Sequence, residues 1–176
     1  LVGKRLTISA FRTLCLNGEG INASGFVFAV DLEMNPLDLA VSNASNGWAD
    51  IRLVPDLATM RRIPWEDNAV IVLCDAYVGD RDEMLAVAPR TILKEQIARA
   101  KELGIAFKFA SELEFFVAAE APDEAWRKEY RDLKMLSNYR SDYQMIQSGR
   151  DEWFIRQIRT LMPQFGISVE SSKPEW

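Results

Sequence analysis

The sequence contains no histidine, and this absence removes several common kinds of catalytic centre. A Ser/His/Asp triad, a Cys/His pair and a histidine-rich zinc site all require an imidazole. The two cysteines, Cys15 and Cys74, lack the spacing of metal ligands and favour a reducing, cytoplasmic compartment. Cys74 lies in an apolar run and is expected to be a buried thiol. The chemistry of this chain is therefore expected to depend on carboxylates.

Long apolar runs and an excess of positive charge are also missing. No stretch approaches the length of a membrane span, and no secretory signal pattern is present. The net charge is −5 and basic residues do not cluster beyond Arg61-Arg62, which argues against nucleic acid or an anionic membrane as the main partner. The 176 residues, 48% hydrophobic and 27% charged, have the composition of one globular domain or two small ones.

Residues 110–117, Ala-Ser-Glu-Leu-Glu-Phe-Phe-Val, carry the strongest chemical signal, and their composition and length predict a β-strand. Alternate side chains of a strand share a face, so Glu112 and Glu114 should point the same way, with Cα atoms about 6.6 Å apart. Their mutual repulsion would be removed by a hard divalent cation such as Mg²⁺ or Mn²⁺. The alternative is a solvated strand face that happens to carry two glutamates.

The rest of the chain mixes helices and strands without strict alternation, which predicts an α+β fold. A domain boundary is expected within residues 80–88, a connector that precedes the clearest helical pattern. Helices are expected at residues 6–17, 89–103, 123–136 and 142–165, strands at 25–31, 50–54, 69–77, 110–117 and 167–170, and a loop at 35–47.

The helix expected at residues 89–103 has the best-defined ends, with Pro89 at its start and Gly104 after its end. Arg90 is expected to pair with a nearby carboxylate and is assigned no chemistry. The buried side of this helix should consist of its regularly spaced apolar residues, which are Ile92, Ile97, Ala100 and Leu103.

Four stretches of the sequence, taken together and in their order, resemble those of one protein family. The first is Ala-Asp-Ile-Arg-Leu-Val-Pro-Asp at residues 49–56, followed by Pro64-Trp65; the second is Ala-Pro-Arg at residues 88–90, followed by Leu93-Lys94. The third is residues 111–116, and the fourth is Gly-Ile-Ser-Val-Glu-Ser-Ser-Lys-Pro-Glu at residues 166–175. They resemble, in turn, the amino-terminal domain, the start of the catalytic domain, the metal-binding strand and the next metal-ligand turn of glutamine synthetases.

The resemblance implies a small β-grasp-like amino-terminal domain at residues 1–85 and the first part of a glutamine synthetase-type catalytic α+β domain at residues 86–176. The chain begins at Leu1 rather than methionine and stops at Trp176 without a closing element. We therefore expect it to be the amino-terminal part of a longer chain, and we expect this polypeptide alone to be inactive.

The family resemblance implies an ATP-dependent ligase that forms a γ-glutamyl phosphate, which ammonia or an organic amine then attacks. By position, Glu112 would bind the metal that faces the ATP phosphates, and Glu114 and Glu175 would bind the metal that faces glutamate. Asp50 would reach into a neighbouring subunit of a homo-oligomeric ring, where it would help to bind and deprotonate the ammonium ion. Its alternative is a strand-start aspartate that accepts hydrogen bonds from nearby backbone amides.

The sequence departs from the family pattern just before the last expected ligand. Many members have histidines there, whereas this chain has Lys173-Pro174. This variant resembles a divergent branch, some of whose members join glutamate to organic amines, so the acceptor amine stays open. Glu170 is expected to be a structural or exposed strand residue, and the tryptophans are expected to pack. The rival interpretation of the whole chain is a non-catalytic glutamine synthetase-like scaffold or binding protein.

Overall fold

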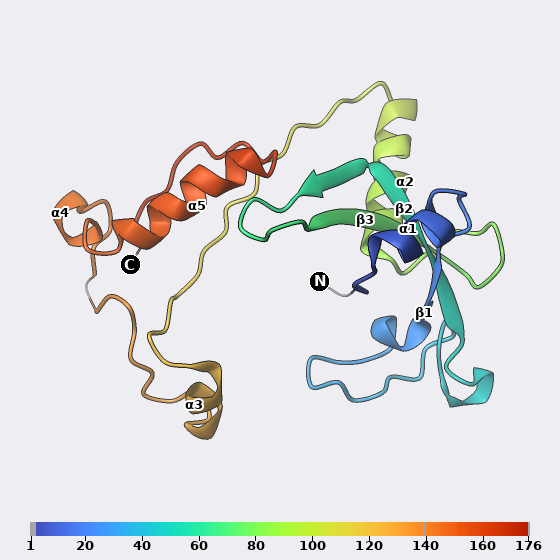
Figure 1. Cartoon of the computed structure of the whole chain (residues 1–176), viewed down its shortest axis with the longest axis horizontal. Helices are drawn as coiled ribbons and strands as arrows, with labels where there is room; N and C mark the ends of the chain where they lie inside the picture. Colours follow the sequence, from blue (N-terminus) through green and yellow to red (C-terminus); the bar gives the residue numbers. More distant parts are fainter. Residues whose placement is uncertain (1–2, 139, 176) are drawn as a thin grey trace. The chain divides into compact units, whose positions relative to one another are not determined.

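The computed structural model describes residues 3–138 and 140–175 (Figure 1). The chain divides into two compact units. The first unit joins residues 1–61 to 70–108, and the second unit joins residues 62–69 to 109–176. The structure has the mixed helix and strand content expected of an α+β protein. The β-grasp-like topology and the domain ranges 1–85 and 86–176 stay predictions.

A small sheet of three strands, in the order β1-β2-β3, forms the centre of the first unit. The strands are β1 (Ile21–Ser24), β2 (Asp50–Arg62) and β3 (Val70–Tyr77). β1 runs antiparallel to β2, with Ile21 opposite Leu53. The hairpin between β2 and β3 is closed by a hydrogen bond from the Ile63 N–H to the Ala69 carbonyl, at 3.0 Å.

The strand predicted at residues 69–77 is confirmed, but the strand predicted at residues 50–54 is longer than expected. β2 continues through Pro55-Asp56, beyond the end of the predicted strand. The last residue of β2 that pairs with β1 is Leu53. Beyond it, a proline can occupy β2 with its missing N–H turned away from the ladder.

The strand predicted at residues 25–31 is wrong, because this segment begins with a short 3₁₀ helix, η1 (Gly25–Phe28). The Ser24 side chain accepts a hydrogen bond from the Phe26 N–H, which stabilises the start of this turn. Gly25 lies against the backbone: its N–H donates to the Ala49 carbonyl at 3.1 Å, and an added Cβ would lie only 2.4 Å from that oxygen. The loop predicted at residues 35–47 contains one short 3₁₀ turn, η2 (Ala44–Asn46), and isolated bridges from Pro36 to Val30 and between Leu39 and Ser42.

Two of the predicted helices are confirmed in the first unit. α1 (Ile8–Cys15) lies within the predicted range 6–17, and the Thr7 side chain caps it by accepting a hydrogen bond from the Ala10 N–H at 3.2 Å. α2 (Pro89–Glu102) begins at the expected proline, and Gly104 follows it with a φ of 70°. Cys15 is buried, whereas Cys74, which was expected to be buried, is only partly covered.

The predicted buried side of α2 is wrong except for Ala100. Ile92, Ile97 and Leu103 are 47, 58 and 68% exposed, whereas Thr91 is buried. The core beside the sheet is small and contains short side chains, so it covers only a narrow strip of the helix. The buried members of that core are Ala23, Ile51, Ala76, Leu85 and Ala88.

The second unit contains three helices in the part that the structure describes, where two were predicted, because the helix predicted at residues 142–165 is divided into α4 and α5. They are α3 (Pro122–Arg127), α4 (Met145–Ser148) and α5 (Glu152–Gln164). The helix predicted at residues 123–136 ends early because the following residues adopt left-handed backbone conformations, with φ of 51° at Glu129 and 58° at Tyr130. No helix of the described residues has the length and apolar character needed to cross a membrane.

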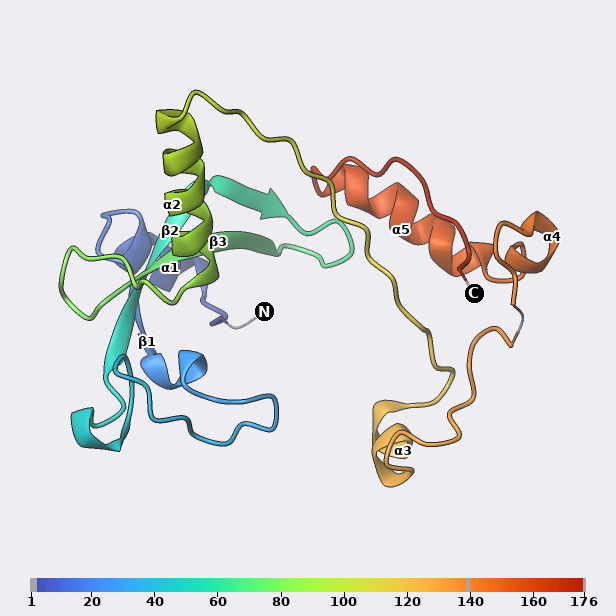
Figure 2. The ribbon, with the colours of Figure 1, turned by 180° about the vertical axis from the view of Figure 1, so that it is seen from behind.

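The strands predicted at residues 110–117 and 167–170 are not hydrogen-bonded strands. Figures 1 and 2 draw the first of these segments as an extended tube, and it forms no ladder among the described residues. Pairing appears only at its end, where the Val117 carbonyl accepts from the Leu136 N–H at 2.7 Å. An apolar, alternating sequence becomes a strand only where a second segment supplies its backbone partners.

Candidate functional site

Glu175 lies beside Glu112 and Glu114 in the second unit, although it is far from them in the sequence. One carboxylate oxygen from each of Glu112, Glu114 and Glu175 lies within 4.8 Å of the other two. All three side chains are exposed. The structure therefore brings together the three residues that the sequence proposes as metal ligands, and we call them the carboxylate group.

The helix α5 contacts both of the segments that carry the carboxylate group. On one side, the ring of Phe115 packs edge-on against Phe154 of α5, with ring centroids 6.4 Å apart. On the other, Arg159 of α5 donates a hydrogen bond to the Ser172 hydroxyl at 2.6 Å. Phe115, which follows Glu114, and Ser172, which is three residues before Glu175, are therefore both held by α5.

The turn after α5 sends the chain back along that helix. Gly166 has a φ of 87°, and the Ile167 N–H donates to the Met162 carbonyl at 3.0 Å, which closes the helix end. The predicted end of this helix at residue 165 is within one residue of the observed end at Gln164. The rings of Trp65 and Phe165 pack at this end with centroids 5.4 Å apart, which confirms a packing role for Trp65.

The carboxylate group has an internal cation beside it. The Lys173 ammonium donates a hydrogen bond to Glu175 Oε2. It also lies 3.7 Å from Asp142 Oδ1 and 4.7 Å from the centroid of the Tyr143 ring. The hydrogen bond to Glu175 is the main cause that raises the pKa of Lys173 above its ordinary value. Sequence reasoning noticed Lys173 as a departure from the family pattern but did not find Asp142 or Tyr143.

The donor set fits a hard divalent cation. It consists of carboxylate oxygens only, with no thiol or imidazole, and this is the ligand type that Mg²⁺ and Mn²⁺ prefer. The three side chains are exposed, which leaves room for water or substrate oxygens to complete the coordination. Glu170, expected to be structural or exposed, is exposed and is not part of the group.

Asp50 lies in the first unit and is not a member of the carboxylate group. It is the first residue of β2, opposite Ser24 of β1, and its side chain is exposed. This agrees with the strand that was predicted to begin at residue 50. Its proposed role in amine binding stays a prediction.

Arg90 has the ion-pair role that the sequence predicts. Its guanidinium contacts Asp56 of β2 at 2.7 Å and Asp75 of β3 at 3.0 Å, and Lys94 contacts Asp75 at 2.5 Å. Burial opposes the ionisation of Asp75, but the hydrogen bonds from Lys94 and Arg90 outweigh it and lower the pKa of this carboxyl. These ion pairs fasten α2 to the sheet.

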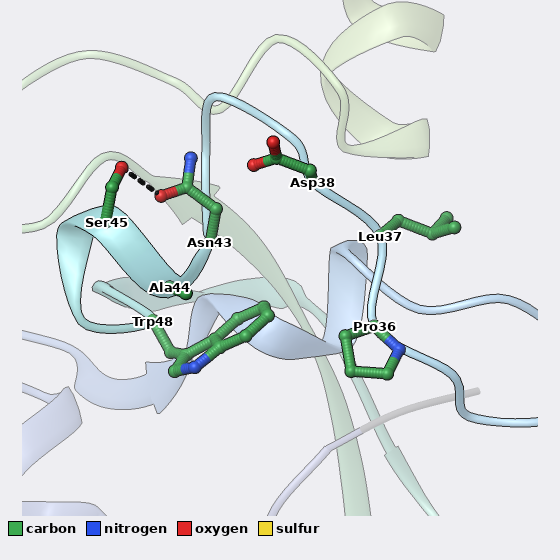
Figure 3. A pocket seen from close by; sticks show the side chains of 7 residues that line it. All are labelled: Pro36, Leu37, Asp38, Asn43, Ala44, Ser45 and Trp48. Carbon is green, nitrogen blue, oxygen red and sulfur yellow. Dashed lines mark hydrogen bonds between the residues drawn. The ribbon is translucent and has the colours of Figure 1, made fainter.

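A pocket of about 320 Å³ opens in the loop before β2 (Figure 3). The Asn43 side chain already accepts hydrogen bonds from the Ser45 hydroxyl at 2.6 Å and the Asn46 N–H at 3.0 Å, so it holds the loop together. The lining residues are Pro36, Leu37, Asp38, Asn43, Ala44, Ser45 and Trp48.

Comparison with known proteins identifies relatives of the whole chain. It is 35% identical over 176 residues to gamma-glutamylethanolamide synthetase GlnA4 of Streptomyces coelicolor, covering 99% of this chain and 38% of that protein. It is 27% identical over 158 residues to glutamate–isopropylamine ligase of a Pseudomonas species, covering 89% of this chain and 34% of the relative. It is also 27% identical over 176 residues to type-1 glutamine synthetase 2 of Dictyostelium discoideum, covering 99% of this chain and 33% of that protein. The chain thus spans between 33 and 38% of the length of these relatives.

The family model for the glutamine synthetase catalytic domain matches residues 86–176, which include the carboxylate group and α5. Two of these relatives are named as a synthetase and a ligase of glutamyl amides. The resemblance predicted from the four sequence stretches is therefore confirmed, and this chain belongs to the glutamine synthetase family.

Proposed function

We propose that the complete protein is an ATP-dependent ligase that joins an amine to the side-chain carboxylate of glutamate through a γ-glutamyl phosphate. The observation that carries this proposal is the meeting of Glu112, Glu114 and Glu175 within the segment that matches the catalytic domain. A bound divalent cation would offset the mutual repulsion of these three carboxylates.

The residues of the chain take separate roles in this proposal. Glu112 binds a divalent metal on the side of the ATP phosphates, and Glu114 and Glu175 bind a second metal on the side of glutamate. Bound Mg²⁺ or Mn²⁺ would supply positive charge that offsets the charge developing during phosphoryl transfer. The fit of the carboxylate group to a hard cation supports these assignments.

Asp50 is proposed to bind the ammonium form of the amine in a neighbouring subunit of a homo-oligomeric ring and then to accept a proton. Its exposure at the start of β2 leaves it available to a partner surface. Asp50→Asn should raise the KM for the amine far more than the KM for ATP. An unchanged KM for the amine would show that Asp50 has only a local structural role.

The acceptor is proposed to be an organic amine rather than ammonia. Two relatives carry ethanolamide and isopropylamine in their names, and Lys173-Pro174 replaces the histidines that many family members have. We further propose that the protein acts in the cytoplasm, since its substrates would be ATP, glutamate and a free amine.

Phosphate release by the complete protein tests the function directly. With ATP, glutamate and Mg²⁺ present, ammonium, ethanolamine and isopropylamine are compared as acceptors, and Glu112→Gln is the inactive control. We expect turnover with at least one organic amine and loss of that turnover in the variant. Phosphate release with none of the three acceptors would favour a scaffold or binding role. The 176-residue chain alone should release no phosphate, because it spans only part of its catalytic relatives.

A further inference from the structure

We propose that Lys173 is a built-in counter-ion of the carboxylate group, which a divalent metal must displace from Glu175, and that Asp142 and Tyr143 hold the ammonium once it is displaced. This inference rests on the proposed metal-binding role of the same group. It makes Lys173 a residue that sets metal affinity rather than a ligand.

In its one observed position, Lys173 contacts the partners that each of the two proposed positions requires. Its ammonium donates to Glu175 Oε2, so it neutralises one member of the carboxylate group. The same nitrogen is 3.7 Å from Asp142 Oδ1 and 4.7 Å from the centre of the Tyr143 ring. A small rotation away from Glu175 therefore leaves the ammonium with a carboxylate and an aromatic face as partners.

The local sequence keeps Lys173 and Glu175 on one side of the chain. Pro174 lies between them, and a proline disfavours the helical conformation in the residue before it. In an extended backbone, side chains two residues apart point the same way. The Lys-Pro-Glu order thus places a cation beside the last expected ligand by covalent geometry, before any tertiary contact forms.

The electrostatic consequence can be given as an order of magnitude. A unit positive charge about 6 Å from a divalent ion repels it enough to change its affinity about tenfold, even at the dielectric constant of water. The Lys173 side chain is only 30% exposed, so solvent screens it less than it screens a fully exposed lysine. Removing this charge should therefore tighten metal binding, whereas strengthening its hold on Glu175 should weaken binding.

Titration calorimetry of the complete protein with Mn²⁺ alone tests these opposite effects. Lys173→Met should bind Mn²⁺ about tenfold more tightly than the unmodified protein. Lys173→Arg keeps the positive charge and should bind Mn²⁺ with nearly unchanged affinity. Lys134→Met is the matched control, because it removes an exposed lysine of the same unit whose charge lies near Glu120 instead.

Asp142→Asn gives the reverse test. Without the Asp142 charge, Lys173 loses its alternative partner and stays on Glu175, so Mn²⁺ affinity should fall about threefold or more. In the double variant with Lys173→Met, this effect of Asp142→Asn should disappear, because the cation that it redirects is gone. Circular dichroism checks that each variant is folded.

The outcomes separate this inference from the proposed function. If Mn²⁺ binds and Glu112→Gln weakens it, the metal site is supported whatever Lys173 does. Unchanged or weaker Mn²⁺ binding in Lys173→Met, or an Asp142→Asn effect that persists without Lys173, would overturn the counter-ion inference alone. Failure of the unmodified protein to bind Mn²⁺ would overturn both.

Discussion

The two compact units differ in what holds them together. The first unit has a hydrogen-bonded sheet and partly buried ion pairs that fasten α2 to it. The second unit has short helices and an extended segment that forms no ladder among the described residues, and its organising contacts are a few side chains on α5. Backbone pairing thus stabilises the first unit, whereas side-chain contacts with α5 hold the segments of the candidate site together in the second unit.

The largest expected effect is on the ion pairs of the first unit. Arg90→Met leaves Asp56 and Asp75 without their shared partner, and the Asp75 side chain is only 13% exposed. We expect the free energy of unfolding to fall by about 3 kcal/mol, since two charge-assisted hydrogen bonds are lost, although Asp75 keeps Lys94 as a partner. Urea denaturation measures this loss.

The control for Arg90→Met is Arg81→Met, which removes an exposed pair with Glu83 at 3.8 Å and should change stability little. The pKa of Asp75 is lower in the folded state than in the unfolded state. The ionised Asp75 therefore stabilises the fold fully above its unfolded pKa of about 3.9, and this stabilisation is lost as the pH falls through the folded-state pKa. The difference between Arg90→Met and the unmodified protein should therefore shrink in acid. Equal losses of stability in Arg90→Met and Arg81→Met would show that the ion pairs of Arg90 do not stabilise the first unit.

The next expected effect tests the backbone packing of the same unit. In Gly25→Ala the new Cβ would lie 2.4 Å from the Ala49 carbonyl oxygen, so the backbone must shift. We expect destabilisation by about 2 kcal/mol, as for other overpacked sites. Gly3→Ala, where nothing lies within 4 Å of the new Cβ, is the control for thermal unfolding. Equal melting temperatures for the two variants would show that the contact at Gly25 is unimportant.

A smaller effect is expected at the carboxylate group of the second unit. Glu114→Gln and Glu112→Gln each keep the side-chain shape but remove one negative charge, so Mn²⁺ affinity should fall about tenfold. Stability should be unchanged or slightly higher, because three carboxylate oxygens within 4.8 Å repel one another when no metal is bound. Calorimetry and thermal unfolding test both parts, and unchanged Mn²⁺ affinity in both variants would contradict the proposed metal site.

The success of sequence reasoning also differs between the units. The pattern of β3 and the Pro89 and Gly104 ends of α2 predicted those elements, because local propensity and tertiary pairing agree there. Residues 110–117 have a strand-like pattern, but their pairing depends on distant segments, which the pattern does not contain. Family resemblance nevertheless proposed Glu112, Glu114 and Glu175, which the structure brings together, because a motif specifies residue types without specifying the pairing of the strand that carries them. The part played by Asp142 and Tyr143 could not be predicted, since it depends on how the chain returns after α5.

The smallest expected effect tests whether side chains on α5 gather the carboxylate group. Phe115→Ala removes the edge-on ring contact with Phe154, which is worth about 1 kcal/mol beyond the area it buries. Since Phe115 follows Glu114 directly, the loss should loosen that ligand and weaken Mn²⁺ binding by about fivefold, the factor that 1 kcal/mol represents. Phe116→Ala is the matched control, because the neighbouring ring is 87% exposed and its removal should leave Mn²⁺ affinity unchanged. Equal Mn²⁺ affinities for the two alanine variants would show that the carboxylates meet without help from α5, and the contrast between the two units would then rest on the first unit alone.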